Sequence, residues 1–380
     1  MIKFENVSKS YKNTNDDVVK NISFEIAKGE LVVLIGPSGC GKTTCLKMIN
    51  RLEKISDGKI YINGKPNIDY DPIELRRSMG YVIQQIGLFP HMTIRDNIEI
   101  IQKLSDVDKD RINSRTYELM KMVSLDADEY LDRYPTQLSG GQLQRIGVAR
   151  AFAMDPEIIL MDEPFSALDP LTRTQLQDEL LYIQSRIKKT IVFVTHDMNE
   201  AIKLADRICI MKEGQIVQYD TPENIMKNPV NDYVSNFVGR NRIWSNPRFI
   251  HAQDIMIEDP FVVPEELSLI HCIEQMRLKH VTSALVINQD NNLVGVINGE
   301  DIQKQSNKNV PVSSLCKYPD FVANEKENLI ELINMFEKNH LSFIPIVNDQ
   351  NRLKGIITKS SLVTTLSHQY IDEKEANNYA

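Results

Sequence analysis

Residues 31–43, Leu-Val-Val-Leu-Ile-Gly-Pro-Ser-Gly-Cys-Gly-Lys-Thr, decide the fold of the first part of the chain. The first five form a continuous apolar run, as expected for a strand that is buried on both faces. A glycine-rich loop follows, and residues 42–51 then have the composition of a helix. Two more apolar runs, residues 158–161 and 191–194, are equally short and β-rich. Short buried strands that alternate with helical stretches predict an α/β sheet. Residues 94–134 look mostly helical and predict a helical insertion in this part of the chain.

Residues 36–43 also match the pattern G-x-x-x-x-G-K-[ST] of a phosphate-binding loop. The glycines let backbone N–H groups surround an anion at the positive end of a helix. Lys42 brings a point charge to the terminal phosphates, and the Thr43 hydroxyl completes the shell of a magnesium ion. The alternative is a glycine turn followed by an exposed lysine. Cys40 lies inside the loop, where we expect backbone amides to lower the pKa of its thiol.

Two adjacent acids, Asp162 and Glu163, follow the apolar run at residues 158–161. The carboxyl ends of strands are where an open α/β sheet presents ligand-binding groups. Asp162 therefore suits a magnesium site, and Glu163 suits orienting and deprotonating an attacking water. The alternative, two acids that merely start a loop, is disfavoured by the phosphate loop upstream.

Composition bounds the class of protein. The chain has 380 residues, 42% of them hydrophobic and 25% charged, which predicts two or three globular domains. The net charge of −8 argues against a protein that holds a nucleic-acid backbone. The five cysteines contain no Cys-x-x-Cys pair, which argues against a disulfide framework or a zinc site and favours a reducing compartment.

Hydrophobic runs are too short for a membrane-spanning helix, which needs about 20 apolar residues. The first residues, Met-Ile-Lys-Phe-Glu-Asn, lack the apolar region of a signal peptide. We therefore expect a cytosolic protein, or one held at a membrane only through a partner.

Leu-Ser-Gly-Gly-Gln at residues 138–142 is a second glycine-rich helix start, and its serine can cap the helix. Together with Tyr11, Gln84, residues 166–169 (Ser-Ala-Leu-Asp) and His196 in this order, it makes residues 1–240 resemble the ATPase subunit of an ABC transporter. The resemblance covers that whole stretch.

The resemblance implies a role for each matching residue. Tyr11 would stack on adenine, Glu163 and His196 would act in hydrolysis with Gln84, and a magnesium ion would be held near Thr43, Gln84 and Asp162. The residues that would contact the ATP phosphates are Ser38, Gly39, Cys40, Gly41, Lys42, Thr43 and Thr44. The residues that would close over ATP bound to the other subunit of a head-to-tail homodimer are Ser139, Gly141 and Gln142.

One phosphate loop without fused membrane spans resembles a separate subunit of a bacterial importer, at the cytoplasmic face of the membrane beside a permease. Residues 84–91 would face that permease, which would explain why the apolar Ile86, Leu88 and Phe89 are exposed, as we expect them to be. A small local core is the alternative explanation for these three side chains.

The last third of the chain is an internal duplication. Residues 261–302 align without a gap with residues 321–362, and twelve of the forty-two aligned positions are identical. Each copy has the pattern helix, strand, Asn-rich turn, strand and short helix, and one unit this small buries its sheet poorly, so we expect the two copies to pack together. Both copies resemble CBS repeats. The expected domains are the ATPase (1–240), a linker (241–252), the two repeats (253–310 and 311–368) and a polar tail (369–380).

An importer ATPase with a C-terminal CBS pair resembles the subunits that power uptake of glycine betaine, carnitine or choline, together with a solute-binding protein or domain. Neither copy has both the Thr and the Asp of the adenosine-binding pattern, since the first has Asn298 and Asp301 and the second has Thr358 and Ser361. The resemblance instead points to cyclic di-AMP held between the CBS pairs of two subunits. The matching positions are Val281, Ser283, Phe343, Ile356 and Lys359.

Three other hypotheses remain open. The CBS lobe could only dimerise or sense ionic strength in an importer of another solute. A DNA-repair or translation ATPase would usually carry two ATPase units and basic surfaces, which this acidic chain lacks. A sensor that binds ATP without hydrolysing it is disfavoured because Glu163 and His196 are both present.

Overall fold

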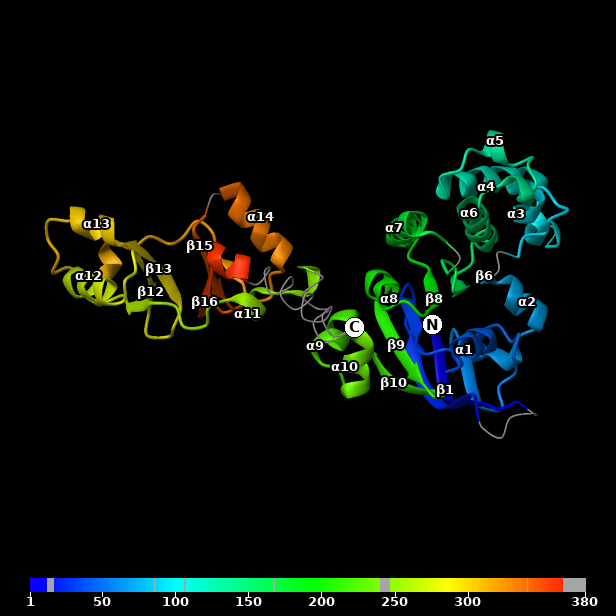
Figure 1. Cartoon of the computed structure of the whole chain (residues 1–380), viewed down its shortest axis with the longest axis horizontal. Coiled ribbons are helices and arrows are strands. Elements are labelled where there is room, and N and C mark those ends of the chain that lie inside the picture. Colours follow the sequence, from blue (N-terminus) through cyan, green and yellow to red (C-terminus); the bar gives the residue numbers. More distant parts are fainter. Residues whose placement is uncertain are drawn as a thin grey trace, which may run out of the picture. The chain divides into compact units, whose positions relative to one another are not determined.

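The computed structural model describes residues 1–11, 17–84, 87–105, 107–166, 168–239, 247–339 and 341–364. The chain divides into two compact units, Met1–Val238 and Gly239–Ala380, each described here by itself (Figure 1). Residues 241–246 of the expected linker and the whole of the expected polar tail lie outside the described residues. No helix in the described part of the chain is long and apolar enough to cross a membrane.

A six-stranded sheet forms the centre of the first unit, in the order β10-β9-β3-β8-β7-β6. Its strands are β3 (Leu31–Ile35), β6 (Met79–Val82), β7 (Ile158–Asp162), β8 (Thr190–Thr195), β9 (Arg207–Lys212) and β10 (Gln215–Asp220). All pair in parallel except β10, which is antiparallel to β9. Along β3, Leu31, Val33 and Ile35 face one core, while Val32 and Leu34 face the other. This burial on both faces explains the unbroken apolar run, and the predicted α/β sheet is confirmed.

A second sheet, antiparallel and in the order β2-β1-β4-β5, packs on one of these cores and was not predicted from the sequence. Its strands are β1 (Ile2–Lys9), β2 (Val19–Ile26), β4 (Asp57–Ile62) and β5 (Lys65–Pro66). In β1 the register shifts between Phe4 and Val7, where Asn6 has a φ of 51°, and such a bulge breaks the alternation that marks a strand.

Helices surround the central sheet. They are α1 (Lys42–Ile49), α2 (Pro72–Arg77), α3 (Ile94–Lys103), α4 (Lys109–Met122), α5 (Ala127–Tyr130), α6 (Gly140–Ala151), α7 (Pro170–Ile187), α8 (Met198–Leu204), α9 (Pro222–Lys227) and α10 (Asp232–Val238). The predicted helical insertion is confirmed as α3, α4 and α5, which lie together with α6 at one end of the unit (Figure 1). Short 3-10 helices are η1 (Asn67–Asp69), η2 (Pro135–Gln137), η4 (Pro247–Phe249) and η5 (Val312–Ser314).

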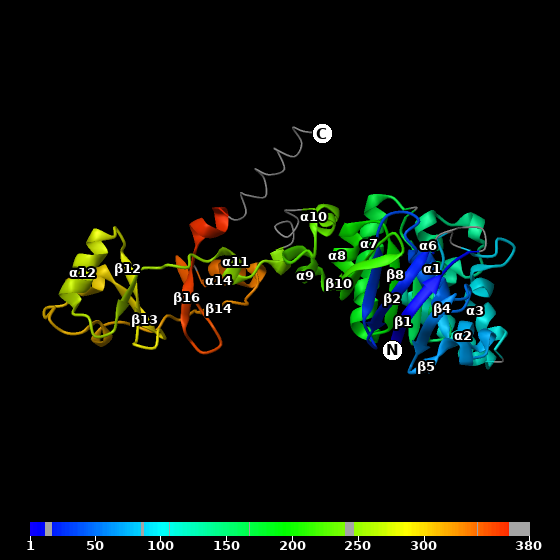
Figure 2. The same ribbon diagram turned by 90° about the horizontal axis from the view of Figure 1, so that it is seen from below.

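The second unit contains two similar halves, visible side by side in Figure 2. The first consists of β11 (Val262–Pro264), α12 (Leu269–Leu278), β12 (Ser283–Ile287), β13 (Leu293–Asn298) and α13 (Gly299–Lys304). The second consists of β14 (Ala323–Asn324), α14 (Leu329–Asn339), β15 (Phe343–Val347), β16 (Leu353–Thr358) and a short helix at residues 359–364. The first strand of each half, and α11 (Ala252–Ile255) before them, were not predicted; the helix, strand, turn, strand and helix were.

The two halves bond to each other through their turns. Leu293 N–H donates to Asn351 O at 3.2 Å, and Leu353 N–H donates to Asn291 O at 3.0 Å. Both asparagines have a left-handed φ, 66° and 61°, a conformation that asparagine tolerates better than most residues. Leu285, Leu293 and Val347 form a small core between the halves. The expected packing of the two copies against each other is confirmed.

Candidate functional site

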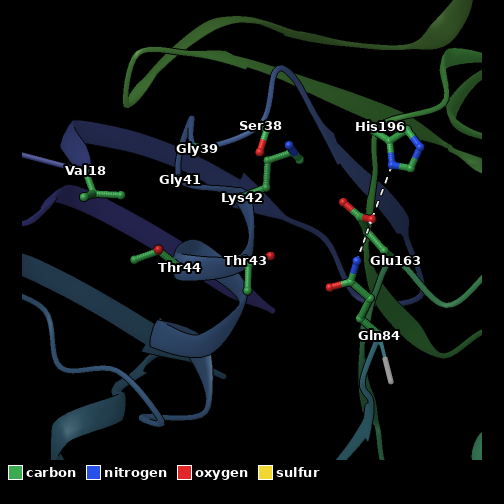
Figure 3. A pocket seen from close by; sticks show the side chains of 10 residues that line it. All are labelled: Val18, Ser38, Gly39, Gly41, Lys42, Thr43, Thr44, Gln84, Glu163 and His196. Atoms are coloured by element: carbon green, nitrogen blue, oxygen red, sulfur yellow. Dashed lines mark hydrogen bonds and ion pairs between the residues drawn. The ribbon is translucent and has the colours of Figure 1, made fainter. Parts of the chain in front are cut away.

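A cavity of about 450 Å³ opens beside the phosphate loop (Figure 3). Its lining residues are Val18, Ser38, Gly39, Gly41, Lys42, Thr43, Thr44, Gln84, Glu163 and His196. Most of the residues expected to contact ATP phosphates therefore share one cavity with the three that were expected to act in hydrolysis.

The phosphate loop joins β3 to α1. Gly41 caps α1 with a φ of 102°, which favours glycine. The Lys42 side chain folds back over the loop and is only 6% exposed. Its ammonium donates to Gly36 O at 2.7 Å and to Pro37 O at 3.0 Å. The loop thus holds a buried cation beside the first turn of α1, where backbone N–H groups also point, and this combination suits an anion.

Oxygen ligands for a hard cation meet at the end of β7. Thr43 Oγ1 donates to Asp162 Oδ1 at 2.8 Å, and the Gln84 side chain lies on the same cavity. Burial raises the pKa of the Asp162 carboxyl, while the Thr43 hydrogen bond opposes this shift. The described residues contain no cluster of three or more His, Cys, Asp or Glu that could hold a metal. Hydroxyl, carboxylate and amide oxygens fit Mg²⁺, which is usually bound by one or two carboxylates together with substrate phosphates.

Glu163 lies between Gln84 and His196 (Figure 3). Gln84 Nε2 donates to Glu163 Oε2 at 3.1 Å, and His196 Nδ1 lies 3.3 Å from the same oxygen. The backbone of Glu163 has a φ of 43°, and its N–H donates to Val194 O at 3.0 Å. Residues with a strained backbone are often found at functional sites. Here the strained residue follows a buried strand, and its carboxylate faces the cavity between two polar side chains.

Tyr11 and Cys40 do not line this cavity. Tyr11 is 36% exposed, and the Lys9 ammonium lies 4.5 Å from the centre of its ring. Cys40 is only 4% exposed, and burial raises the pKa of its thiol. The expected lowering of this pKa is wrong, because the side chain is buried in the core and this burial outweighs the opposing effects of Lys42 and the loop N–H groups.

Ser139, Gly141 and Gln142 form the start of α6 and also lie outside the cavity lining. The Ser139 hydroxyl accepts from Gln142 N–H at 3.3 Å, and Gln142 Oε1 accepts from Ser139 N–H at 2.8 Å. This reciprocal cap fixes the loop before α6. The same chain therefore does not close its own nucleotide cavity with these residues.

The stretch at residues 84–91 is only partly apolar at the surface. Gln85 and Ile86 lie outside the described residues. Phe89 is 43% exposed, whereas Leu88 packs against the core, so the expectation of an exposed Leu88 is wrong. Phe89 lines a second cavity of about 450 Å³. Other apolar residues that line it are Ile73, Met79, Ile83, Ile100, Ile101, Leu104 and Met154.

The five positions matched to a dinucleotide site lie on both halves of the second unit. Ser283 and Phe343 begin β12 and β15 and pair with Asn298 and Thr358 at equivalent positions. Phe343 and Ile356 pack beside the small core between the halves, Val281 packs in the first half, and Lys359 is exposed. In the second half, Ser361 N–H donates to Thr358 Oγ1 at 3.1 Å and Thr358 N–H donates to Ser361 Oγ at 3.0 Å.

Comparison with known proteins assigns both units. A family model described as ABC transporter matches residues 19–166, and one described as CBS domain matches residues 252–307 and 312–368. The glycine betaine/carnitine/choline transport ATP-binding protein OpuCA of Bacillus subtilis is 48% identical over 96% of this chain and 95% of its own length. The chain belongs to the family of quaternary-amine ABC transporter ATPases. As a member of this family it hydrolyses ATP in coupling to transport.

Other relatives and a solved structure support this family assignment. The carnitine transport ATP-binding protein OpuCA of Listeria monocytogenes is 48% identical over 96% of this chain and 91% of its own length. The osmoprotectant import ATP-binding protein OsmV of Salmonella typhimurium is 39% identical over 97% of this chain and 96% of its own length. An ATP-binding cassette solved as a dimer bound to ADP and Pi is 36% identical, with a TM-score of 0.53 over 58% of this chain and 99% of that one.

The sequence motifs of this ABC ATPase predicted most of the residues that line the cavity, but they did not predict some residues in and around it. Val18 lines the cavity from the segment before β2 and belongs to no motif. Lys9, under the Tyr11 ring, and Glu200, behind the His196 turn, were also missed. For Lys9 the available signal was its spacing, because residues two apart in an extended segment share a face, whereas no sequence signal marked Glu200.

Proposed function

We propose that the chain powers import of a quaternary-amine solute, such as glycine betaine, carnitine or choline, through a separate membrane permease. The relatives named for these solutes match almost the whole chain, CBS pair included, and this observation carries the proposal. The geometry around Glu163 supports the hydrolytic part. A solute-binding protein or domain would complete the transporter at the cytoplasmic face of the membrane.

Different residues of the chain have different roles in the proposed hydrolysis of ATP. Lys42 exchanges its two loop carbonyls for the terminal phosphates of ATP. Glu163 orients the attacking water and takes its proton, while Gln84 and His196 hold the carboxylate in place. His196 also contacts the γ-phosphate. A Mg²⁺ ion held near Thr43, Asp162 and Gln84 would neutralise charge on the phosphates.

The complete site needs a second copy. Ser139, Gly141 and Gln142 lie outside their own cavity, so in this proposal they contact ATP bound to the partner of a head-to-tail homodimer. The similar cassette solved as a dimer bound to ADP and Pi supports a dimeric active unit. The apolar cavity that includes Phe89 would receive the permease, next to Gln84, so that opening and closing of the dimer moves the membrane partner.

Glu163→Gln tests the hydrolytic role. We expect the rate of ATP hydrolysis to fall about 100-fold or more, because the water loses its base, while the protein keeps ATP and elutes as a dimer in gel filtration. Glu157→Gln is the matched control, since Glu157 is exposed at the other end of the same strand and pairs with Lys28 at 2.9 Å. Wild-type hydrolysis by Glu163→Gln would reject the assignment.

Solute identity is tested by uptake of radiolabelled glycine betaine, carnitine and choline into cells that express the chain with its permease. ATP-dependent uptake of at least one of them, lost in Glu163→Gln, is the expected result. Uptake of none of them would favour an importer of another solute.

We also propose that the CBS pair is a regulatory lobe that binds cyclic di-AMP between two subunits, at Val281, Ser283, Phe343, Ile356 and Lys359. The partly exposed Phe343 ring can stack on a base, and the exposed Lys359 can meet a phosphate. Calorimetric titration of the full chain should show one cyclic di-AMP per two chains, with AMP as comparator. Binding should weaken in Phe343→Ala and Lys359→Ala but not in Lys354→Ala, which replaces an exposed lysine on β16 outside the five matched positions. Absence of binding would leave dimerisation or ionic-strength sensing as the role of the lobe.

A further inference from the structure

A carboxylate that belongs to none of the motifs is buried behind the His196 turn. Glu200, on α8, is only 6% exposed, and burial raises its pKa. Thr195 Oγ1 donates to Glu200 Oε2 at 2.6 Å, and Gln177 Nε2 donates to Glu200 Oε1 at 3.2 Å. Arg173 Nε lies 3.9 Å from Oε1. Burying a carboxylate is costly, so a group with this many partners has a defined place in the fold.

These contacts hold both neighbours of His196. The Thr195 hydroxyl donates to Glu200 and accepts from Asp197 N–H at 3.0 Å. Arg173 Nη1 also lies 3.9 Å from Asp197 Oδ2. The His196 side chain itself is 64% exposed, so packing does little to orient it. Its position 3.3 Å from Glu163 therefore depends on the two residues that flank it.

The same cluster reaches the segment that follows Glu163. Arg173 Nη2 donates to Leu168 O at 2.9 Å, and Glu163 O accepts from Ser166 Oγ at 3.0 Å. Arg173 thus contacts Glu200 on one side and the chain just after the proposed base on the other. Glu200 lies where the supports of Glu163 and His196 meet.

We propose that Glu200 is a positioning residue for ATP hydrolysis: through Thr195 it fixes the His196 turn, and through Arg173 it fixes this turn relative to the segment after Glu163. The inference rests on the roles proposed above for Glu163 and His196. It predicts that loss of this network slows the chemical step without weakening ATP binding.

Thr195→Val in the full chain is the first test, because valine keeps the volume of threonine and removes the hydroxyl. We expect kcat to fall about tenfold and the KM for ATP to change less than about twofold. Lys203→Ala is the matched control. It breaks the 2.8 Å pair of Lys203 with Asp178, which also joins α8 to α7 but does not touch the His196 turn. Thermal unfolding should show that both variants are folded.

A double-mutant cycle separates positioning from a general loss of structure. If the hydroxyl acts through His196, adding Thr195→Val to His196→Ala lowers kcat no further. Glu200→Gln keeps the volume of the side chain, and a flipped Gln177 amide restores both hydrogen bonds, so this variant should be milder than Glu200→Ala.

Two results would overturn the inference: an unchanged kcat in Thr195→Val, or an equal loss of kcat with and without His196. Wild-type hydrolysis by His196→Ala would instead remove the role proposed for His196 itself. Failure of the positioning role and failure of the proposed catalytic role are thus distinguishable.

Discussion

Lys9 lies beneath the ring of Tyr11, the residue that we expect to stack on adenine. Its ammonium donates to Lys54 O at 2.8 Å and lies 3.3 Å from Glu53, so it is anchored independently of the tyrosine. A cation 4.5 Å from the ring centre holds the phenol in one orientation. If Tyr11 stacks on adenine, as the sequence resemblance implies, Lys9 preorganises the stacking surface.

Lys9→Met should therefore raise the KM for ATP about threefold to tenfold with little change in kcat, given the usual strength of a partly buried cation–π contact. Steady-state kinetics on the full chain measure both constants. Lys3→Met is the control, since Lys3 lies on the same strand and over another ring, Tyr61, at 5.8 Å from its centre. An unchanged KM in Lys9→Met would show that the contact serves only the fold.

Replacing Asp162 should remove activity but increase stability, and the gain in stability should depend on pH. Burial raises the pKa of its carboxyl above the ordinary 3.8, so the ionised group destabilises the fold at neutral pH. Asp162→Asn should abolish hydrolysis yet raise Tm at pH 7 by about 2 °C. The gain should shrink as the pH falls through the raised pKa, because wild-type Asp162 then takes up its proton in the folded state.

Asp169→Asn should have the opposite effect: it should lower Tm at pH 7, and this loss should shrink as the pH falls. The Thr172 hydrogen bonds lower the pKa of Asp169, which caps α7, so its stabilising effect is present at pH 7 and is lost as the pH falls through the lowered pKa. Thermal unfolding of both variants between pH 7 and about pH 3 tests both signs, because the lowered pKa of Asp169 lies below the ordinary 3.8. A lower Tm for Asp162→Asn at pH 7 would contradict the argument.

Among the elements, β6 and α6 approach so closely that glycine is required between them. A Cβ built on Gly80 would lie 2.4 Å from Ala151 O, a backbone atom at the end of α6. Gly80→Ala should lower the free energy of unfolding by about 2 kcal/mol, measured by denaturant titration. Gly140→Ala, where nothing lies within 4 Å of the added Cβ, should cost far less. Equal effects would mean that the backbone at β6 shifts freely.

Elements were predictable where burial alone determines the pattern. The run at residues 31–35 is buried on both faces and needs no partner to be recognised. The strand β1 was missed because the bulge at Asn6 interrupts its alternation. At the site, motif residues such as Lys42 and Glu163 were predicted, whereas Glu200 was not, because its partners on α7 are contacts that only the fold creates.

At the scale of the whole molecule, the two units have separate cores. Every residue of the two large cores lies before Gly239, and every residue of the three smaller ones lies after it. Differential scanning calorimetry of the full chain should show two transitions, and ATP should raise only the one that belongs to Met1–Val238. A single unfolding transition that shifts as a whole when ATP is added would contradict the independence of the two units.

The duplication was the most predictable feature at this scale, because the same pattern occurs twice and each copy supports the interpretation of the other. Asn291 and Asn351 are one of the twelve identical pairs, and the structure gives the reason: both residues have a left-handed φ in a turn, and both bond to the opposite half.

Strand order in the six-stranded sheet also has a consequence for biosynthesis. β3 leaves the ribosome early, but its two neighbours, β8 and β9, begin only at Thr190 and Arg207. At roughly 5–20 residues per second, the nascent chain carries this apolar strand without hydrogen-bonding partners for many seconds. An unpaired apolar strand promotes aggregation. Translation that stalls before Thr190 therefore yields a substrate for chaperones and proteases, and never a partly working ATPase.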